Sequence, residues 1–474
     1  MGSFNLNLYA TKPMKYKSFI LLDTNMTNSY KPDFMLIKLS NDFRNFHSKG
    51  INNRFLFGIL FHEWLHYFHN VSTNFGMSTF TSTASLWLYF HNSNINGKAI
   101  DHSKYKESIT KFNSILFHSR KNVNKGRDLR DINKRNFELL EVFKAELKST
   151  QYGNETLHTY VCQIRIKDQG EHAQTIEVGA LEIFENLAYL LEKKLVKNLQ
   201  ERDTSDSKFE SFSEPPIVPY RMIELLLSHF ELNLSNDDCI RVMITLLLAV
   251  DSLELLEPLI NEIKIYQSEG KSVETCLIEI TENILKQNNI IERLNNTEEW
   301  IKQYFPIDDS IGLSIKSIFK VIKTNLETRN RNPFVEFDIL NQLKENPQKF
   351  SEVLKKYSSC AIMVPLAANK IIDRTINSEL ISLGEVGHLE NWQQFHAALH
   401  FLGLHIKEDG GFMDTSELPN SCCPFYNVCT VKPKQDNNDI CRYKPWENYD
   451  AINPTSDMCW YGCGVRQTTY CPNQ

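Results

Sequence analysis

The sequence lacks the features that mark several protein classes. No apolar run approaches the roughly 18 residues that a membrane-spanning helix needs, and the longest candidates, residues 55–61 and 243–250, are flanked by polar residues. The N-terminus has no continuous apolar segment, so a secretory signal is not expected. Basic residues are not in excess, because 52 Lys and Arg stand against 58 Asp and Glu, and no phosphate-binding loop occurs. These absences predict a cytoplasmic protein with neither a membrane nor a nucleic-acid partner.

The composition is that of a folded protein. Of the 474 residues, 42% are hydrophobic and 11% are aromatic, which excludes wholesale disorder and is enough for a core of ordinary size. Apolar residues recur every three or four positions over much of the chain, and a few shorter stretches alternate. We therefore predict an α+β fold that is mostly helical, with a small sheet.

Two kinds of pattern locate the expected elements. Residues 33–40 alternate between apolar and polar and are typical of a strand, and the β-rich runs 158–167 and 172–178 flank a short Gly-containing loop, which predicts a hairpin. Residues 78–90 are apolar but rich in Thr and Ser, so their structure stays open. The expected helices are 52–69, 176–199, 221–230, 237–250, 253–267, 273–286, 311–328, 347–357 and 390–404.

Three units are expected along the chain. The stretch 203–219 is polar and then proline-bearing, which makes it the strongest linker signal. It separates a first unit, residues 1–205, from a helical domain, residues 206–409. A Gly-Gly break then begins a Cys-rich module, residues 410–474, whose short segments are typical of metal-held folds.

The most informative motif is H-E-x-x-H, formed by His62-Glu63-Trp64-Leu65-His66. At this composition about 0.03 chance matches are expected in the chain. Residues i and i+4 share a helix face, so His62 and His66 can bind one ion, and zinc suits two imidazoles with a carboxylate and an open position. Glu63 lies beside them, where it can accept a proton from a water on the ion, because the pKa of that water falls toward ~7.

The third ligand must come from elsewhere in the chain. His69 lies on the same helix face, but seven residues at 1.5 Å per residue place it about 10 Å along the axis from His62. One straight helix therefore cannot bring His62, His66 and His69 to a single ion, and His69 is expected near the site rather than in it. Ser72 stands at the third histidine position of the longer H-E-x-x-H-x-x-G-x-x-H motif, which excludes that form.

A second segment, residues 179–188 (GALEIFENLA), resembles the gluzincin group of zinc metallopeptidases when it is taken together with the H-E-x-x-H segment. In that group the third ligand is a glutamate on a second helix, often within E-G-x-A, and Glu185 begins a matching E-x-x-A. The resemblance implies a zincin-like unit in residues 1–205, with Glu185 as the third ligand and Glu182, or neither, as the alternative. Residues 62–76 are also similar to uncharacterised bacterial H-E-x-x-H proteins, which assigns no substrate.

The implied chemistry is zinc-assisted hydrolysis of peptide bonds in a restricted protein substrate. Glu63 would act as the general base and then return the proton to the leaving amine. The hairpin at 158–178 offers strand addition to an extended peptide, and the helical domain offers a surface for a substrate or a regulatory protein partner. A further donor should stabilise the oxyanion, and its candidates are His158, Tyr160, His172 and Tyr189.

A second group of metal-ligating residues lies near the C-terminus. Seven of the 11 cysteines fall between residues 422 and 471, and in a reducing compartment such clusters more often hold metal than form disulfides. No C-x2-C pair occurs there, so the usual zinc-ribbon signature is missing. The residues expected to bind a second, structural zinc or an iron–sulfur cluster are Cys423, Cys429, Cys441, Cys459 and Cys463, with disulfides as the alternative. His396 and His400 have no acidic residue between them and are interpreted as a polar stripe on a core helix.

A function of another class stays open at this point. The H-E-x-x-H site can be structural or degenerate, and the helical domain and the tail would then make the chain a regulatory or interaction protein. The two hypotheses differ in whether Glu63 takes part in chemistry.

Overall fold

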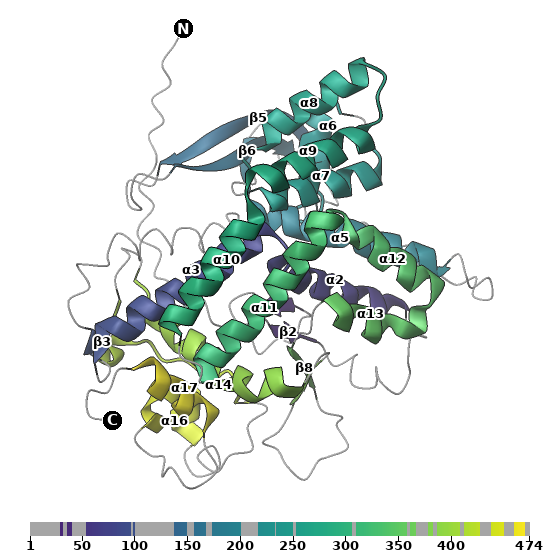
Figure 1. Cartoon of the computed structure of the whole chain (residues 1–474). Coiled ribbons are helices and arrows are strands. Elements are labelled where there is room, and N and C mark those ends of the chain that lie inside the picture. Colours follow the sequence, from purple (N-terminus) through teal and green to yellow (C-terminus); the bar gives the residue numbers. More distant parts are fainter. Residues whose placement is uncertain are drawn as a thin grey trace, which may run out of the picture.

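Helices account for most of the described residues of this computed structural model (Figure 1). The prediction of a mostly helical α+β chain is therefore confirmed at that level, with the strands confined to small sheets. The structure describes residues 29–31, 36–39, 54–95, 98–99, 137–148, 156–166, 173–200, 217–232, 234–249, 253–305, 310–357, 361–365, 378–382, 386–407, 412–426, 438–449 and 459–469.

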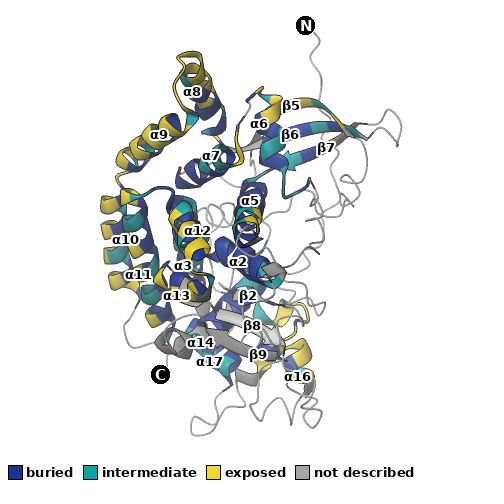
Figure 2. Cartoon of the chain, turned by 90° about the vertical axis from the view of Figure 1, so that its right-hand side faces the viewer, coloured by how far each residue is buried: buried dark blue, intermediate teal, exposed yellow. Residues whose placement is uncertain are grey.

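The helix that carries the H-E-x-x-H motif lies at the centre of the molecule. It is α2, Arg54–Asn70, close to the expected bounds of 52–69. Almost all of its described side chains are buried, as the dark blue colour of α2 in Figure 2 shows. A helix that is buried all round is typical of a core element rather than a surface one. Phe57 near its start packs against Phe350 at the start of α13, Phe350–Tyr357.

The helix after α2 is the one whose sequence pattern was ambiguous. Helix α3, Asn74–Ser93, is rich in Thr and Ser, which compete with the backbone for hydrogen bonds in other conformations. Here those hydroxyls bond to the carbonyl one turn back, as Thr79 does to Phe75 O at 3.0 Å and Thr83 does to Thr79 O at 3.0 Å. The hydroxyls are thereby satisfied inside the helix, and the apolar side chains of α3 enter the core.

One small sheet lies beside α2 and is built from distant parts of the chain. Its strand order is β1-β2-β8-β9, with β1 at Ser29–Lys31 and β2 at Leu36–Lys38. Strand β2 confirms the centre of the strand expected at 33–40, and it pairs in parallel with β8, Ala361–Pro365. Strand β9, Ser378–Ser382, pairs antiparallel with β8, and neither of these two strands was predicted. A two-stranded ladder of β3, Asn94–Ile95, and β4, Lys98–Ala99, follows α3.

The second sheet leads directly to the other helix of interest. Strands β5, Phe137–Lys148, β6, Thr156–Ile166, and β7, Ala173–Val178, form an antiparallel sheet in that order. The expected hairpin is confirmed as β6 and β7, whereas β5 was not predicted. Helix α5, Ala180–Gln200, begins after Gly179, later than the expected residue 176, because residues 176–178 pair in the sheet.

The rest of the chain is a set of amphipathic helices and a compact C-terminal part. Helices α10 and α12 were not predicted, because their apolar positions are few and lie among polar residues. The 3-10 segments η6–η8 are Pro347–Lys349, Thr415–Glu417 and Pro445–Tyr449. The remaining helices are α6 (Met222–His229), α7 (Asn236–Leu248), α8 (Leu256–Ser268), α9 (Val273–Gln287), α10 (Ile290–Tyr304), α11 (Ser310–Arg331), α12 (Val335–Glu345), α14 (Val386–His405), α16 (Asn438–Tyr443) and α17 (Trp460–Thr468).

The C-terminal part is held by a close helix crossing. Gly464 of α17 lies against α14, where an added Cβ would stand 2.5 Å from Gln394 O and 2.6 Å from the Cβ of Ala397. No side chain larger than hydrogen fits at that position without moving a helix. Gly464 therefore sets the distance between these two helices.

A buried ion pair fixes the C-terminal end of α2 to the helical region. The side chains of Arg329 and Glu336 are both 0% exposed, and Arg329 Nη2 lies 2.6 Å from Glu336 Oε1. The guanidinium also donates to Ser72 Oγ at 2.9 Å and to Pro333 O at 2.7 Å. His69, on the last turn of α2, lies 3.0 Å from Glu336 Oε1 through its Nε2. Every charge in this cluster is thus paired, which a buried charge requires.

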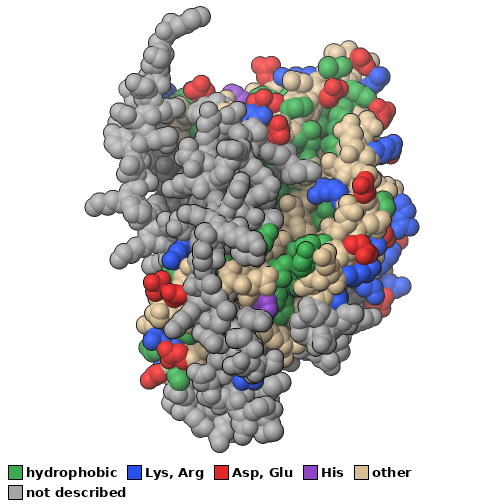
Figure 3. All heavy atoms as spheres, turned by 60° about the vertical axis from the view of Figure 1, so that its left-hand side comes forward, with side chains coloured by type: hydrophobic (Ala, Val, Ile, Leu, Met, Phe, Trp, Pro, Cys, Tyr) green, Lys and Arg blue, Asp and Glu red, His purple; other side chains and the backbone are tan. Residues whose placement is uncertain are grey.

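These contacts join residues on the two sides of the boundary expected near residue 205. The pairing of β2 with β8 does the same. The division into three units stays a prediction. None of the described helices is both long and apolar enough to cross a membrane. On the face shown in Figure 3, acidic and basic side chains of the described residues are interspersed.

Replacing Arg329 with Met should lower the free energy of unfolding by about 3–5 kcal/mol, because Glu336 is left in the core without its cation. The double variant Arg329→Met/Glu336→Leu removes both charges and should lose less than the single variant. Urea denaturation at pH 7 measures both values. A double variant as unstable as the single one would contradict this account of the pair.

Candidate metal centre

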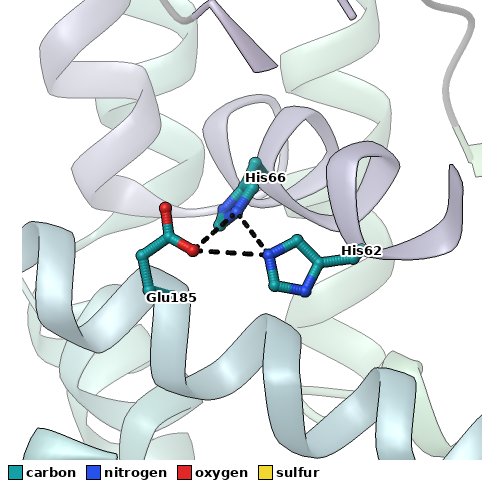
Figure 4. A group of neighbouring side chains, drawn as sticks. All are labelled: His62, His66 and Glu185. Carbon is teal, nitrogen blue, oxygen red and sulfur yellow. Dashed lines mark hydrogen bonds and ion pairs between the residues drawn. The ribbon is translucent and has the colours of Figure 1, made fainter. Parts of the chain in front are cut away.

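Three side chains from α2 and α5 converge on one point. The Nε2 atoms of His62 and His66 lie 3.1 Å apart, and Glu185 Oε2 lies 3.3 Å from the first and 3.4 Å from the second. Figure 4 shows both imidazoles projecting from α2 toward the carboxylate on α5. Both histidines are buried and Glu185 is half-buried, and the three residues form a group that can hold a metal ion.

The spacing of the three donor atoms provides a test of fit. Ligands of a tetrahedral zinc ion, at bond lengths of 2.0–2.1 Å, are about 3.3 Å from one another. Neighbouring ligands of an octahedral ion with similar bond lengths would be about 2.9 Å apart. Two of the observed separations, 3.3 and 3.4 Å, are close to the tetrahedral value, and the third, 3.1 Å, lies midway between the two values. Two nitrogens and one oxygen are also donors that zinc accepts.

The two helices can approach closely because small residues face the crossing. An added Cβ on Gly58 of α2 would lie 2.9 Å from Val196 Cγ2 and 3.2 Å from Glu192 Oε1, both on α5. Ala188, one turn after Glu185, is fully buried, as expected of a residue that lets α5 pack closely. The short distance between helices is what allows Glu185 to reach the histidines.

A further carboxylate supports the site and was not predicted. Glu192 Oε2 lies 3.0 Å from His62 Nδ1, on the opposite side of the ring from Glu185. Such a bond fixes the ring orientation and places the proton on Nδ1, so that Nε2 is free to bind a metal. Glu192 follows Glu185 by seven residues and therefore lies on the same face of α5. That spacing was the available signal, although it becomes meaningful only once the helices are seen to cross.

The histidines and Glu185 are strongly coupled. Burial alone would lower the pKa of His62, but hydrogen bonds to Glu185 and Glu192 hold it well above its ordinary value. Burial would raise the pKa of Glu185, but the charge of His66 and the bonds to both histidines hold it well below its ordinary range. A bound dication would replace the shared proton, since metal ligation requires neutral imidazoles and an ionised carboxylate.

Glu63 lies next to this group and is buried as well. Burial raises its pKa above the ordinary value, while the charges of His62 and His66 oppose the shift. The backbone N–H of Tyr30, in strand β1, donates to its carboxylate. The Tyr30 ring also stacks on His66, with the centroids 6.5 Å apart. Strand β1 therefore lies directly against the predicted base.

Tyr220 is a second residue of the site that sequence reasoning missed. Its ring lies 6.1 Å from that of His62 and 6.5 Å from that of Tyr189, measured between centroids. Burial, followed by the charges of three carboxylates, raises the pKa of its phenol. Those carboxylates are Glu185, Glu63 and Glu192. The phenol stays protonated at neutral pH and can donate a hydrogen bond. It directly follows the stretch 203–219 that was interpreted as a linker, and no local pattern pointed to it.

The other expected oxyanion donors have different positions. Tyr160 is fully buried in β6 opposite Val178 of β7. Tyr189 reaches the site through its contact with Tyr220. The side chain of His158 and the whole of His172 lie outside the described residues.

Glu182, the alternative third ligand, has another role in the structure. Its Oε2 accepts the backbone N–H of Gly179 at 2.7 Å and thereby caps the start of α5. Its Oε1 has no hydrogen-bond partner among the described residues, and the side chain is fully buried. Burial raises the pKa of this carboxyl to about 7. His69, as expected, lies near the site without joining the triad.

The C-terminal cysteines are partly described. Cys423, Cys441 and Cys459 are buried and Cys463 is partly buried, whereas Cys429 lies outside the described residues. Within the described ranges, His62, His66 and Glu185 form the one group close enough to share an ion. The second metal or cluster therefore stays a prediction.

The histidines of α14 are core residues. His396 and His400 are both fully buried. His400 Nδ1 is hydrogen-bonded to the Tyr461 hydroxyl at 2.8 Å, and burial lowers the pKa of His400 to about 3. Burial also holds the pKa of His396 well below its ordinary value. Both imidazoles are therefore neutral near pH 7.

Comparison with known proteins found no relative. No family model, curated protein or solved structure matches this chain. The interpretation of the site depends on its own geometry and chemistry.

The purified chain should carry about one zinc ion at the α2–α5 crossing. His62→Ala/His66→Ala should remove that ion, because two of three donors are lost, while His229→Ala, at an exposed position on α6, should not. Elemental analysis of the metal per chain measures this. Equal zinc content in the wild type and in the double variant would exclude a metal at this site. If the double variant loses one zinc ion and still retains another, the retained zinc would indicate a site at the cysteines.

The raised pKa of Glu182 predicts a pH-dependent stability. The unfolded chain loses this proton near pH 4.5 and the folded chain near pH 7, so wild-type stability falls as the pH rises between those values. Glu182→Gln keeps the cap and lacks the buried charge. In the presence of EDTA, the free energy of unfolding of the wild type minus that of the variant should fall by about 3 kcal/mol from pH 4.5 to pH 7. A difference that does not change with pH would contradict the assignment.

Proposed function

We propose that this chain is a zinc-dependent metallopeptidase with a gluzincin-like site. The observation that carries the proposal is the His62, His66 and Glu185 triad, whose donor atoms lie close enough to share one ion, with the buried carboxylate of Glu63 beside it. The sequence motifs and the geometry of the donor atoms indicate the same three ligands.

Charge also favours a dication at this position. The carboxylates of Glu63, Glu185 and Glu192 are all largely buried around two imidazoles. Buried negative charges repel one another and require a compensating cation. A zinc ion supplies two positive charges at the point where the donors converge.

When bound, zinc would polarise a carbonyl group and make a water acidic enough to lose its proton near neutral pH. The chain's own residues would then direct the reaction. Glu63 accepts the proton of the attacking water and delivers it to the leaving amine, and its raised pKa suits a group that both takes and gives a proton. Glu192 holds the His62 ring in the orientation that ligation needs. Tyr220 donates a hydrogen bond from its phenol to the developing oxyanion.

The strand next to the base favours a peptide as the substrate. Strand β1 stands at one end of the described order β1-β2-β8-β9, and its backbone at Tyr30 contacts Glu63. An edge strand is the element to which an extended peptide adds by main-chain hydrogen bonds. A substrate paired along β1 would bring one of its peptide bonds past Glu63. We further propose that the large helical part restricts which protein segments reach that strand.

Glu63→Gln should lower peptide hydrolysis at least about 100-fold while the zinc content and the fold stay unchanged, because the amide cannot accept the proton. The assay uses zinc-loaded protein with a quenched-fluorescence peptide library, and Glu282→Gln, at an exposed position on α9, serves as the matched control. Wild-type hydrolysis by the Glu63→Gln variant would overturn the proposal and favour a structural metal site in a regulatory protein.

A further inference from the structure

The residue after the third ligand makes three side-chain hydrogen bonds to another helix. Asn186 is 0% exposed. Its Oδ1 accepts the backbone N–H of Ile223 at 3.0 Å and that of Glu224 at 3.2 Å. Its Nδ2 donates to Glu224 Oε2 at 3.1 Å. Asn186 thus connects α5 to the first turn of α6.

Helix α6 depends on this connection for its cap. The first N–H groups of a helix have no partner inside it, and a side chain at the preceding residue usually accepts them. Arg221, at that position, makes no side-chain cap bond. Asn186 supplies the missing acceptor from another helix, so the start of α6 is fixed relative to α5 and not only by its own sequence.

The start of α6 also determines where Tyr220 lies. Tyr220 precedes Arg221, whose backbone N–H donates to Ile217 O at 2.8 Å and closes a turn around it. Its ring contacts His62 and Tyr189. Successive helix residues point about 100° apart, so Glu185 faces α2 while Asn186 faces α6. Two adjacent residues of α5 therefore link the metal centre to the turn that carries Tyr220, so the positions of the two depend on each other.

We propose that Asn186 is a positioning residue that sets the location of the Tyr220 phenol relative to the metal centre. Its effect on turnover rests on the proposed function, whereas the cap and the position of the phenol do not. A purely structural asparagine would affect stability alone. If Asn186 instead positions the phenol, replacing Asn186 should move the phenol and lower the turnover number, as the loss of the Tyr220 hydroxyl does.

The test uses four variants of the full-length, zinc-loaded chain and a fifth that combines Asn186→Ala with Tyr220→Phe. Asn186→Ala removes all three bonds. Asn186→Asp/Glu224→Gln exchanges donor and acceptor between the two side chains, and it keeps the net charge and the three hydrogen bonds of residue 186. Tyr220→Phe removes the hydroxyl. Ser235→Ala removes the cap of α7, where Ser235 Oγ accepts the N–H of Asp238 at 3.1 Å in an exposed position, and it is the matched control.

Amide exchange and the NMR signal of tyrosine labelled with ¹³C at Cζ report on the structure without turnover. The signal of Tyr220 is the one that disappears in Tyr220→Phe. In Asn186→Ala the amides of Ile223 and Glu224 should exchange at least tenfold faster and the Tyr220 signal should shift. Both should return toward wild-type values in Asn186→Asp/Glu224→Gln. Unchanged exchange and an unchanged signal in Asn186→Ala would overturn the proposal.

Hydrolysis of the best peptide from the library gives the functional readout. Asn186→Ala and Tyr220→Phe should each lower kcat about 10- to 100-fold with KM changed less than threefold. The combined variant Asn186→Ala/Tyr220→Phe should be no slower than Tyr220→Phe alone. Ser235→Ala should stay within twofold of the wild type. Multiplicative effects of the two substitutions would overturn the proposal. If the wild type hydrolyses no peptide, the proposed function fails, while exchange and the tyrosine signal still decide whether Asn186 positions Tyr220.

Discussion

A single constraint organises this structure: the buried helix α2 carries three histidines and a glutamate in the core. His62, Glu63, His66 and His69 of α2 have little contact with water, and buried polar groups are costly unless they are hydrogen-bonded or paired. Three of the surrounding elements supply partners. Helix α5 supplies carboxylates to His62 and His66, strand β1 supplies a backbone N–H to Glu63, and α12 supplies a carboxylate to His69. The helices around α2 are thus held in place by its polar groups as much as by its apolar ones.

Helix α5 combines three roles along one stretch of its surface. Glu185 completes the metal-ligating group, Asn186 caps α6, and Glu192 orients His62. Gly58 of α2 leaves the space that lets these side chains reach their partners. These residues all lie on helices, and helices hold side-chain positions more exactly than loops do.

Much of this arrangement could be predicted from local patterns. The H-E-x-x-H motif, the helix around it and the β6–β7 hairpin each depend on residues near one another in the chain, and Glu185 was implied by the family resemblance. Glu192, Tyr220 and Asn186 could not be found in that way, because their roles arise only when α2, α5 and α6 meet in space. The sequence of helix α3 was ambiguous because Thr and Ser hydroxyls can bond to the backbone in helical and in non-helical conformations. Strand β8 forms by pairing with a strand more than 300 residues earlier in the chain.

The connection between His69 and Glu336 has a consequence for how the protein is made. The two residues are 267 positions apart in the chain, and strand β2 is separated by even more residues from its parallel partner β8. During synthesis from the N-terminus, α2 leaves the ribosome long before Arg329 and Glu336 exist to neutralise its far end. Contacts of such long range form late and slow the folding of a chain. In a newly made molecule, His69 at the end of α2 therefore lacks its carboxylate partner until most of the polypeptide has emerged.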